Sequence, residues 1–203
     1  MVSHKYRFLF IHYPKTAGCS VGYKLKSQNI VKNFIPQVDI HYETKYDVKR
    51  AIENNYFIFT TKRNPFDRLV SLWKYWNKRL RGENATTFAF SNFVFEYDKI
   101  KDKIKDKFGE KEAVHFIPMN KFINRISFEL LNIEDVDFFM EFADIYRDWK
   151  IVCKKLNIHC SPLRNRNSTK HKHYTEYYDD ETRQIVAEKY AKDIEYFNYK
   201  FGE

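Results

Sequence analysis

Two short stretches of the chain contain the residue types of a phosphate-binding turn. The first reads Pro-Lys-Thr-Ala-Gly-Cys-Ser and follows an apolar run. Lys15 supplies a mobile cation, Gly18 lets the backbone curl and approach a ligand closely, and Ser20 supplies a hydroxyl donor. A helix beginning near Cys19 would add N–H groups and the positive end of its dipole. The stretch can hold a phosphate or sulfate group, or it can be an ordinary turn with an exposed lysine.

The second stretch reads Thr-Thr-Lys-Arg-Asn-Pro-Phe-Asp-Arg-Leu-Val-Ser and also follows an apolar run. Arg63 stands where that run ends, and Ser71 comes two helical turns later. An arginine can bind a phosphate through two parallel hydrogen bonds, so the pair can clamp a second phosphate. Alternatively, Arg63 forms a structural salt bridge with Asp67 or Asp39. For Asp67 and Arg68 we favour the structural role.

The first turn does not have the order of a Walker A loop. That loop begins with glycine and ends in Gly-Lys-Ser/Thr, whereas here the lysine comes first. A P-loop-type kinase therefore remains an alternative enzyme, although the position of the lysine argues against it. A cysteine phosphatase needs Cys-x5-Arg, and the position counted from Cys19 holds Leu25, which excludes that class.

Strands alternate with helices along the chain. Apolar and β-branched runs predict strands over residues 7–13, 56–61 and 137–142. Helical spacing of apolar residues predicts helices over residues 20–28, 44–54, 65–79, 145–156 and in the tail 181–197. This order predicts an α/β, three-layer, P-loop-like fold with a central, mostly parallel sheet flanked by helices. Ligands bind such sheets at the carboxyl ends of the strands, where both turns fall.

No repeat, linker or composition change marks a boundary, so we expect a single domain over residues 1–203. The 36 basic residues exceed the 27 acidic ones, and the net charge of +9 attracts anions. A nucleic-acid-binding module is the alternative outside the enzymes. It would use the basic cluster of Lys74, Lys78, Arg79 and Arg81. Most of the aromatic residues fall at core spacing, which argues against nucleic acid as a partner.

The cysteines and the hydropathy bear on the cellular compartment. Cys19, Cys153 and Cys160 form no CxxC pair, so neither a disulfide framework nor a metal site is expected. No segment has the apolar length of a membrane span, and the amino-terminal strand is too short for a signal peptide. We therefore expect a soluble, cytoplasmic protein with no membrane partner. Nothing in the sequence indicates an oligomeric state.

With both turns in view, the chain resembles the sulfotransferases, particularly the carbohydrate sulfotransferase-like branch. "PKTAGCS" and "RNPFDRLVS" resemble the two nucleotide-binding signatures of that family. The stretches "HFIP", "DWKIVCKKLNI" and the tail resemble its later segments, so the resemblance covers most of the chain. Three positions depart from the family pattern. Cys19 replaces a threonine or small residue, Lys62 an apolar residue and Ala143 a glutamate.

The resemblance implies the sulfuryl donor 3'-phosphoadenosine 5'-phosphosulfate (PAPS) and no metal. It places the 5'-phosphosulfate on the first turn and the 3'-phosphate on Arg63 and Ser71. Ser168 and Lys170 would close over the nucleotide, or lie in a plain solvated loop. The residues implied for the first turn are Lys15, Thr16, Ala17, Gly18, Cys19 and Ser20.

The implied reaction is in-line transfer of a sulfuryl group to an acceptor hydroxyl. Lys15 would stabilise the bridging oxygen of the leaving phosphate. His41 is the candidate base, because the carbohydrate branch has a histidine between its first helix and its second signature; it can also be an exposed loop histidine. His12 is expected to be packed in the core or to line the pocket. The resemblance favours a saccharide acceptor, while a protein tyrosine or a small metabolite stays open.

Overall fold

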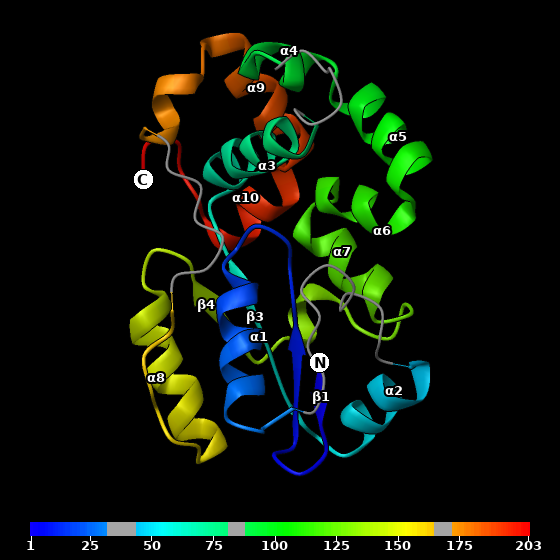
Figure 1. Cartoon of the computed structure of the whole chain (residues 1–203), viewed down its shortest axis with the longest axis vertical. Coiled ribbons are helices and arrows are strands. Elements are labelled where there is room, and N and C mark those ends of the chain that lie inside the picture. The colour runs from blue at the N-terminus through cyan, green and yellow to red at the C-terminus, as the bar shows by residue number, and fades with distance from the viewer. Residues whose placement is uncertain (32–43, 81–87, 165–171) are drawn as a thin grey trace. The chain divides into compact units, whose positions relative to one another are not determined.

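The computed structural model describes residues 1–31, 44–80, 88–164 and 172–203. The chain divides into two compact units (Figure 1). We call Met1–Arg63 with Met119–Asn167 the sheet unit, and Asn64–Pro118 with Ser168–Glu203 the helical unit. Each is described by itself. The single domain expected over residues 1–203 stays a prediction.

The sheet unit contains a four-stranded sheet in the order β1-β2-β3-β4. Its strands are β1 (Val2–Ser3), β2 (Phe8–Ile11), β3 (Phe57–Lys62) and β4 (Phe138–Glu141). β1 pairs antiparallel with β2, whereas β2, β3 and β4 are parallel to one another. This mostly parallel sheet confirms the predicted α/β class and all three predicted strands. The two-residue β1 was not predicted, because so short a strand leaves no alternation pattern.

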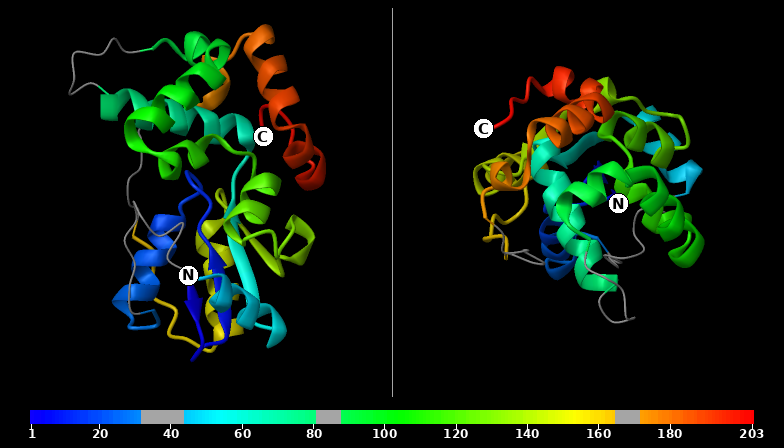
Figure 2. Two further views of the ribbon diagram at one scale, coloured as in Figure 1. Left: turned by 90° about the vertical axis from the view of Figure 1, so that its right-hand side faces the viewer. Right: turned by 90° about the horizontal axis from the view of Figure 1, so that it is seen from above.

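One face of the sheet carries aromatic and sulfur-containing side chains, because alternate residues of a strand point to the same side. Phe10 of β2, Phe59 of β3 and Met140 of β4 are fully buried there. The helices α1 (Gly18–Ser27) and α8 (Ile145–Leu156) pack their apolar side chains on this face (Figures 1 and 2). They confirm two predicted helices.

The opposite face buries Leu9, Ile11 and Ile58. The helix α2 (Lys45–Glu53) contacts β1 and β2 in this part of the unit. Thr44 caps α2, because its hydroxyl accepts a hydrogen bond from the backbone N–H of Asp47 and the Asp47 carboxylate accepts one in return. α7 (Met119–Ile126) and a short 3-10 turn, Ile133–Asp135, complete the helical elements described for this unit.

All regular elements described in the helical unit are helices. They are α3 (Pro65–Leu80), α4 (Phe90–Phe95), α5 (Tyr97–Phe108), α6 (Glu110–Ala113), α9 (Asp180–Lys189) and α10 (Ala191–Phe197), with 3-10 turns at Val114–Phe116 and Tyr174–Tyr177. α3 begins as predicted, with Pro65 in its first position and the Asn64 side chain accepting a hydrogen bond from the Phe66 N–H at 3.1 Å. The tail pattern forms two helices that meet at Tyr190.

Arg68 organises the core of the helical unit. Only 1% of its surface is exposed. Its guanidinium donates to the carbonyls of His115 and Ile117 at 3.1 and 3.4 Å, and to the Tyr190 hydroxyl at 3.0 Å. Arg68 therefore has the structural role that we expected. It links α3 to the turn before α7 and to the end of α9.

Among the described residues, every helix falls short of the length and apolar character that a membrane crossing requires.

Candidate functional site

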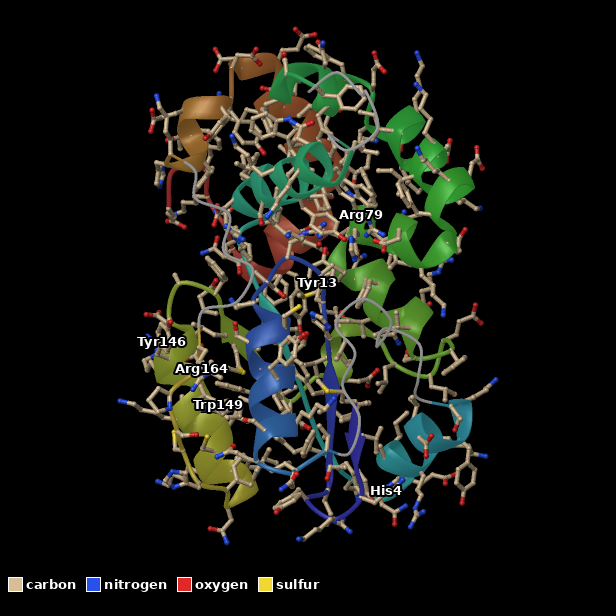
Figure 3. The ribbon with its side chains drawn as sticks, in the orientation of Figure 1. His4, Tyr13, Arg79, Tyr146, Trp149 and Arg164 are labelled. Atoms are coloured by element: carbon tan, nitrogen blue, oxygen red, sulfur yellow. The ribbon has the colours of Figure 1, made fainter. Side chains whose placement is uncertain are left out.

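Threonine hydroxyls link the first turn to β3 and link the ends of β2 and β3 to each other. The Thr16 hydroxyl lies 2.7 Å from the Tyr13 carbonyl and 2.6 Å from the Thr61 hydroxyl, and the Thr60 hydroxyl donates to the Ile11 carbonyl at 2.6 Å. All three threonines are fully buried. Figure 3 labels Tyr13 at the tip of β2, directly before this turn. Because the Thr16 hydroxyl holds the turn in place, we expect Thr16 to serve a ligand through its backbone.

Two residues of the turn that are not glycine have an unusual backbone conformation. Lys15 and Ala17 both have a φ of 69°. Such conformations cost about 1–3 kcal/mol each and persist only where the surroundings hold them. α1 then starts at Gly18, and its N-cap residue Ala17 has no polar side chain to cap the helix. The N–H groups at this helix end and the positive end of its dipole favour an anion.

Gly18 is needed for a different reason from the one expected. Its φ is not positive, so the turn does not depend on glycine's backbone freedom. Instead, a Cβ atom at Gly18 would lie 2.1 Å from Cδ2 of His12. The imidazole therefore occupies the space where a side chain would project, and any larger residue must displace it. The sequence indicated the importance of this glycine but not its cause.

His12 lies in the core beside the turn. Only 7% of it is exposed, its ring stacks on Phe10, and its Nε2 lies 3.7 Å from Sγ of Cys19. Burial, and then the charged amino terminus, lower the pKa of His12 from 6.5 to about 4. The ring is therefore neutral at pH 7. The positive charge of the turn comes from Lys15 and the helix end.

This shift predicts that stability falls with acidification. The unfolded chain protonates His12 near pH 6.5, whereas the folded chain resists until about pH 4. The contribution is fully present above pH 6.5 and is lost as the pH falls through 4, a loss of about 3 kcal/mol in the free energy of unfolding. Urea unfolding between pH 7 and 4 measures it. His12→Gln should show a shallower loss over that range, and parallel curves for the two proteins would contradict the assignment.

Arg63 connects the ends of three strands. Its Nη1 donates to the Lys15 carbonyl at 3.1 Å, and its guanidinium carbon lies 4.0 Å from the ring centroid of Phe142, directly after β4. The side chain is 9% exposed. The structure thus brings the Arg63 guanidinium to the backbone of Lys15, the other cationic residue that the sequence placed at a strand end. Asp39, one alternative partner for Arg63, lies outside the described residues.

The other predicted site residues lie in different parts of the chain, and some lie outside the described residues. Cys19 and Ser20 lie in the first turn of α1, partly exposed and buried respectively. Ser71 lies in the helical unit, on α3, and is buried. The candidate base His41 and the loop residues Ser168 and Lys170 lie outside the described residues.

Sequence reasoning missed Thr61 and Phe142 and left the placement of His12 open. A threonine at the end of a strand is too common to indicate a site, and Phe142 stands far from both motifs in the sequence. The parallel register, in which Lys62 pairs with Glu141, brings the ends of β3 and β4 together and so brings Phe142 to Arg63. Such pairing could be inferred only once strand order was known.

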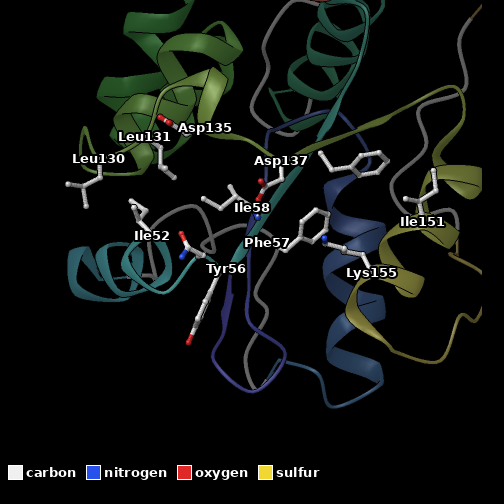
Figure 4. A pocket seen from close by; sticks show the side chains of 12 residues that line it. Ile52, Tyr56, Phe57, Ile58, Leu130, Leu131, Asp135, Asp137, Ile151 and Lys155 are labelled. Atoms are coloured by element: carbon white, nitrogen blue, oxygen red, sulfur yellow. Dashed lines mark hydrogen bonds between the residues drawn. The ribbon is translucent and has the colours of Figure 1, made fainter.

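A cavity of about 660 Å³ lies elsewhere in the sheet unit, lined by residues that include Ile58, Asp137 and Lys155 (Figure 4). It sits at the amino ends of β3 and β4 and contains none of the predicted site residues. The Asp137 carboxylate there accepts a hydrogen bond from the Ile58 N–H at 2.7 Å, which is a structural contact. Parallel sheets bind ligands at the other end of the strands, so we assign the site to the turn.

The basic cluster is partly engaged in contacts within the chain. Arg79 forms an ion pair with Glu112 at 2.6 Å and lies over the rings of Trp76 and Phe108, and Lys74 lies 4.5 Å from the Trp73 ring centroid. In the described part of the chain, His, Cys, Asp and Glu side chains form no group of three or more that could hold a metal ion.

Comparison with known proteins identifies the family of the chain. A model of the sulfotransferase family matches residues 1–200. No curated protein and no solved structure matches the chain. The matched residues include both turns and all but the last three residues of the chain.

Proposed function

Because the chain belongs to the sulfotransferase family, we propose that it transfers a sulfuryl group from PAPS to a saccharide hydroxyl. Membership establishes a sulfotransferase enzyme; the donor, the acceptor and the residue roles are the proposal. The observation that carries it is the hydrogen bond from Arg63 to the Lys15 carbonyl, because it joins the two cationic strand ends in one place. A nucleotide with phosphate groups on both sides of its ribose needs two such anion sites side by side.

The residues of the turn fit an anionic donor. Such a donor would supply an activated sulfuryl group on a phosphate leaving group. The uncapped amino end of α1 offers N–H groups, and Lys15 is partly exposed. We assign the 5' end of the donor to Lys15, Thr16, Ala17, Gly18, Cys19 and Ser20. Arg63 and Ser71 would hold the 3'-phosphate, and Ser168 and Lys170 would close over the nucleotide.

The catalytic contribution of the turn is electrostatic. Negative charge grows on the bridging oxygen as the bond to sulfur breaks, and a fixed cation at that oxygen lowers the barrier. Lys15 carries that cation. Its backbone is held by Arg63 through the carbonyl and by the neighbouring Thr16 hydroxyl, so the lysine starts from a fixed point and little reorganisation is needed.

A base must remove the proton of the acceptor hydroxyl, and we propose His41. We expect His41→Ala to lower turnover about 100-fold, the lower end of the range for general-base catalysis. Affinity for adenosine 3',5'-bisphosphate, the nucleotide left after transfer, should stay within threefold, roughly the scatter allowed to an uninvolved residue. Initial rates and calorimetric titration measure the two quantities. Turnover equal to the wild type would exclude His41 as the base.

The donor assignment is tested by thermal unfolding with three ligands. Adenosine 3',5'-bisphosphate at 100 times its Kd should raise the free energy of unfolding by about 2.7 kcal/mol, and the midpoint by about 5–10 °C. ATP–Mg²⁺ and a short oligonucleotide should raise it less. A larger shift with ATP–Mg²⁺ would favour a P-loop-type kinase, and a larger shift with the oligonucleotide would favour a nucleic-acid-binding module.

A further inference from the structure

A cavity at the amino ends of β3 and β4 carries opposite charges on its two sides. It is the cavity of about 660 Å³ described above, and most of its lining residues are apolar. Figure 4 shows Leu131 and Asp135 on one side of it, and Ile151 and Lys155 of α8 on the other. Ile151 is exposed, so the apolar lining reaches the solvent. An apolar patch that is open to solvent and bordered by charges is typical of an interaction surface.

A turn beside this cavity displays an aromatic side chain. Phe128 is 41% exposed and comes two residues before Leu130, which lines the cavity. Phe128 and Glu129 lie just after the end of α7, with φ angles of 58° and 65°. Such a conformation is unfavourable for a bulky residue and suits asparagine better. The local fold therefore does not explain the phenylalanine, whereas a role of its exposed ring in binding does.

Hydrogen bonds hold this turn in place. The buried Ser127 hydroxyl accepts a hydrogen bond from the Leu131 N–H at 3.0 Å, and the Glu129 N–H donates to the Asn124 carbonyl at 2.8 Å. Phe128 is therefore presented from a fixed backbone, and an anchor that is already ordered loses little conformational entropy on binding. Aromatic side chains contribute a large share of the energy of protein interfaces.

The charged groups beside the cavity can interact with another molecule. The Asp135 and Asp137 carboxylates each accept a backbone N–H through Oδ2 at 2.7 Å, which leaves their Oδ1 atoms for a further donor. The Lys155 Nζ lies 5.6 Å from the Phe57 ring centroid and forms no ion pair with any residue that the structure describes. The side formed by residues 130–137 is thus negative, and the α8 side is positive.

We propose that this face of the sheet unit is a two-fold interface between two copies of the chain. Phe128 of each copy enters the cavity of the other, and Lys155 of each copy meets Asp135 or Asp137 of the other. The inference goes beyond the transfer reaction. It does not depend on the donor assignment, because the cavity contains none of the residues proposed to bind the donor.

A second copy is favoured as the occupant because the face is complementary to itself. In a two-fold contact the same surface meets itself, so a projecting group must find a hollow on that surface, and positive charges must find negative ones. Phe128 and the cavity supply the first pair, and Lys155 with the two aspartates supplies the second. A small ligand would fill the cavity without using the exposed aromatic ring. A partner of one charge would meet like charge on one side, which is unfavourable.

The mass of the full chain in solution, measured by sedimentation velocity over a dilution series, tests the interface. The wild type should be a dimer at about 100 μM, since specific interfaces have Kd values in the micromolar range or below. Phe128→Asn should raise the Kd at least about 30-fold, as loss of an aromatic anchor does. Circular dichroism should show this variant folded, because asparagine adopts a positive φ readily. The matched control is Phe95→Asn in the helical unit, where a phenylalanine 48% exposed is replaced and the Kd should not change.

The charges are tested by reversal and by cross-linking. Lys155→Glu should raise the Kd at least about tenfold, because it places like charges opposite each other. Lys103→Glu makes the same change on the exposed surface of α5 and should leave the Kd unchanged. A carbodiimide joins amines to carboxylates that are in contact. In a mixture of isotopically labelled and unlabelled wild type, it should link Lys155 to Asp135 or Asp137 in peptides of mixed label, which form only between two copies.

A wild type that is a monomer at about 100 μM overturns the inference. A dimer whose Kd is unchanged by Phe128→Asn or by Lys155→Glu also overturns it, as does one that Phe95→Asn weakens equally. A dimer that both variants weaken, and that gives mixed-label links at Lys155, supports it. Because Lys155→Glu leaves the turn at Phe128 untouched, it decides the question even if Phe128→Asn does not fold.

Discussion

Arg63→Ala is expected to weaken the binding of adenosine 3',5'-bisphosphate by about 30- to 5,000-fold, that is, by roughly 2–5 kcal/mol. This is the scale for removing one partner of a buried charge pair, and Arg63 is only 9% exposed. The variant also loses the hydrogen bond to the Lys15 carbonyl and the contact with the Phe142 ring. Isothermal titration calorimetry measures the change directly.

The preceding residue offers a matched control. Lys62 carries the same charge, but its Nζ lies 3.1 Å from the Glu141 carboxylate. Lys62→Ala should change nucleotide affinity less than about threefold, because partly exposed ion pairs contribute roughly 0–1 kcal/mol. Arg63→Lys should lie between, since lysine keeps the charge but cannot form two parallel hydrogen bonds to a phosphate. Equal affinities for Arg63→Ala and the wild type would exclude Arg63 from the 3'-phosphate site.

Loss of the fold must be distinguished from loss of the ligand contact. Urea unfolding of Arg63→Ala without ligand reports the structural part alone. Since the guanidinium joins segments after β2, β3 and β4, some loss of stability is expected. A folded variant at the assay temperature with the predicted loss of affinity supports the binding role. A loss of affinity that appears only where the variant unfolds would contradict that role.

The fold could be predicted largely because its strands are buried on both faces. A strand such as β3, with phenylalanines toward one helical layer and Ile58 toward the other, begins with three apolar residues and is easy to recognise. The starts of helices could also be predicted where a side chain caps the helix, as at Thr44 and Asn64. β1 could not be predicted, because two residues bonded at an edge carry no periodic signal.

The candidate site could be predicted from the sequence as residue types and chain positions, and the roles of these residues stay predictions. Lysine and arginine at strand ends led to the prediction of two anion sites, since parallel strands bring their carboxyl ends to one edge. The sequence does not show which side chains hold the turn in place and which backbone groups stay available to a ligand. Thr16 was expected at the ligand, but its hydroxyl is committed to Tyr13 and Thr61. Gly18 was expected to bend the chain, whereas Lys15 and Ala17 adopt the positive φ and Gly18 makes room for His12.

Lys15→Met is expected to lower the turnover number by about 10²- to 10³-fold, the usual loss when one preorganised group at a developing negative charge is removed. Methionine keeps an unbranched side chain, one atom shorter than that of lysine, and removes the charge. The Lys15 carbonyl that binds Arg63 belongs to the backbone and remains in the variant, so the second anion site should stay intact. Adenosine 3',5'-bisphosphate affinity should therefore fall by much less than turnover.

The comparison of turnover with nucleotide affinity distinguishes a catalytic role for Lys15 from simple attraction of the donor. A lysine that only attracts the donor would stabilise the ground state and the transition state equally, and its loss would raise KM with turnover unchanged. Lys26→Ala is the matched control, because it removes the same charge from the exposed far end of α1. It should leave turnover within about twofold, as surface substitutions usually do. If Lys15→Met turns over like Lys26→Ala, the leaving oxygen is stabilised by another group, and the reactive end of the donor does not lie at this lysine.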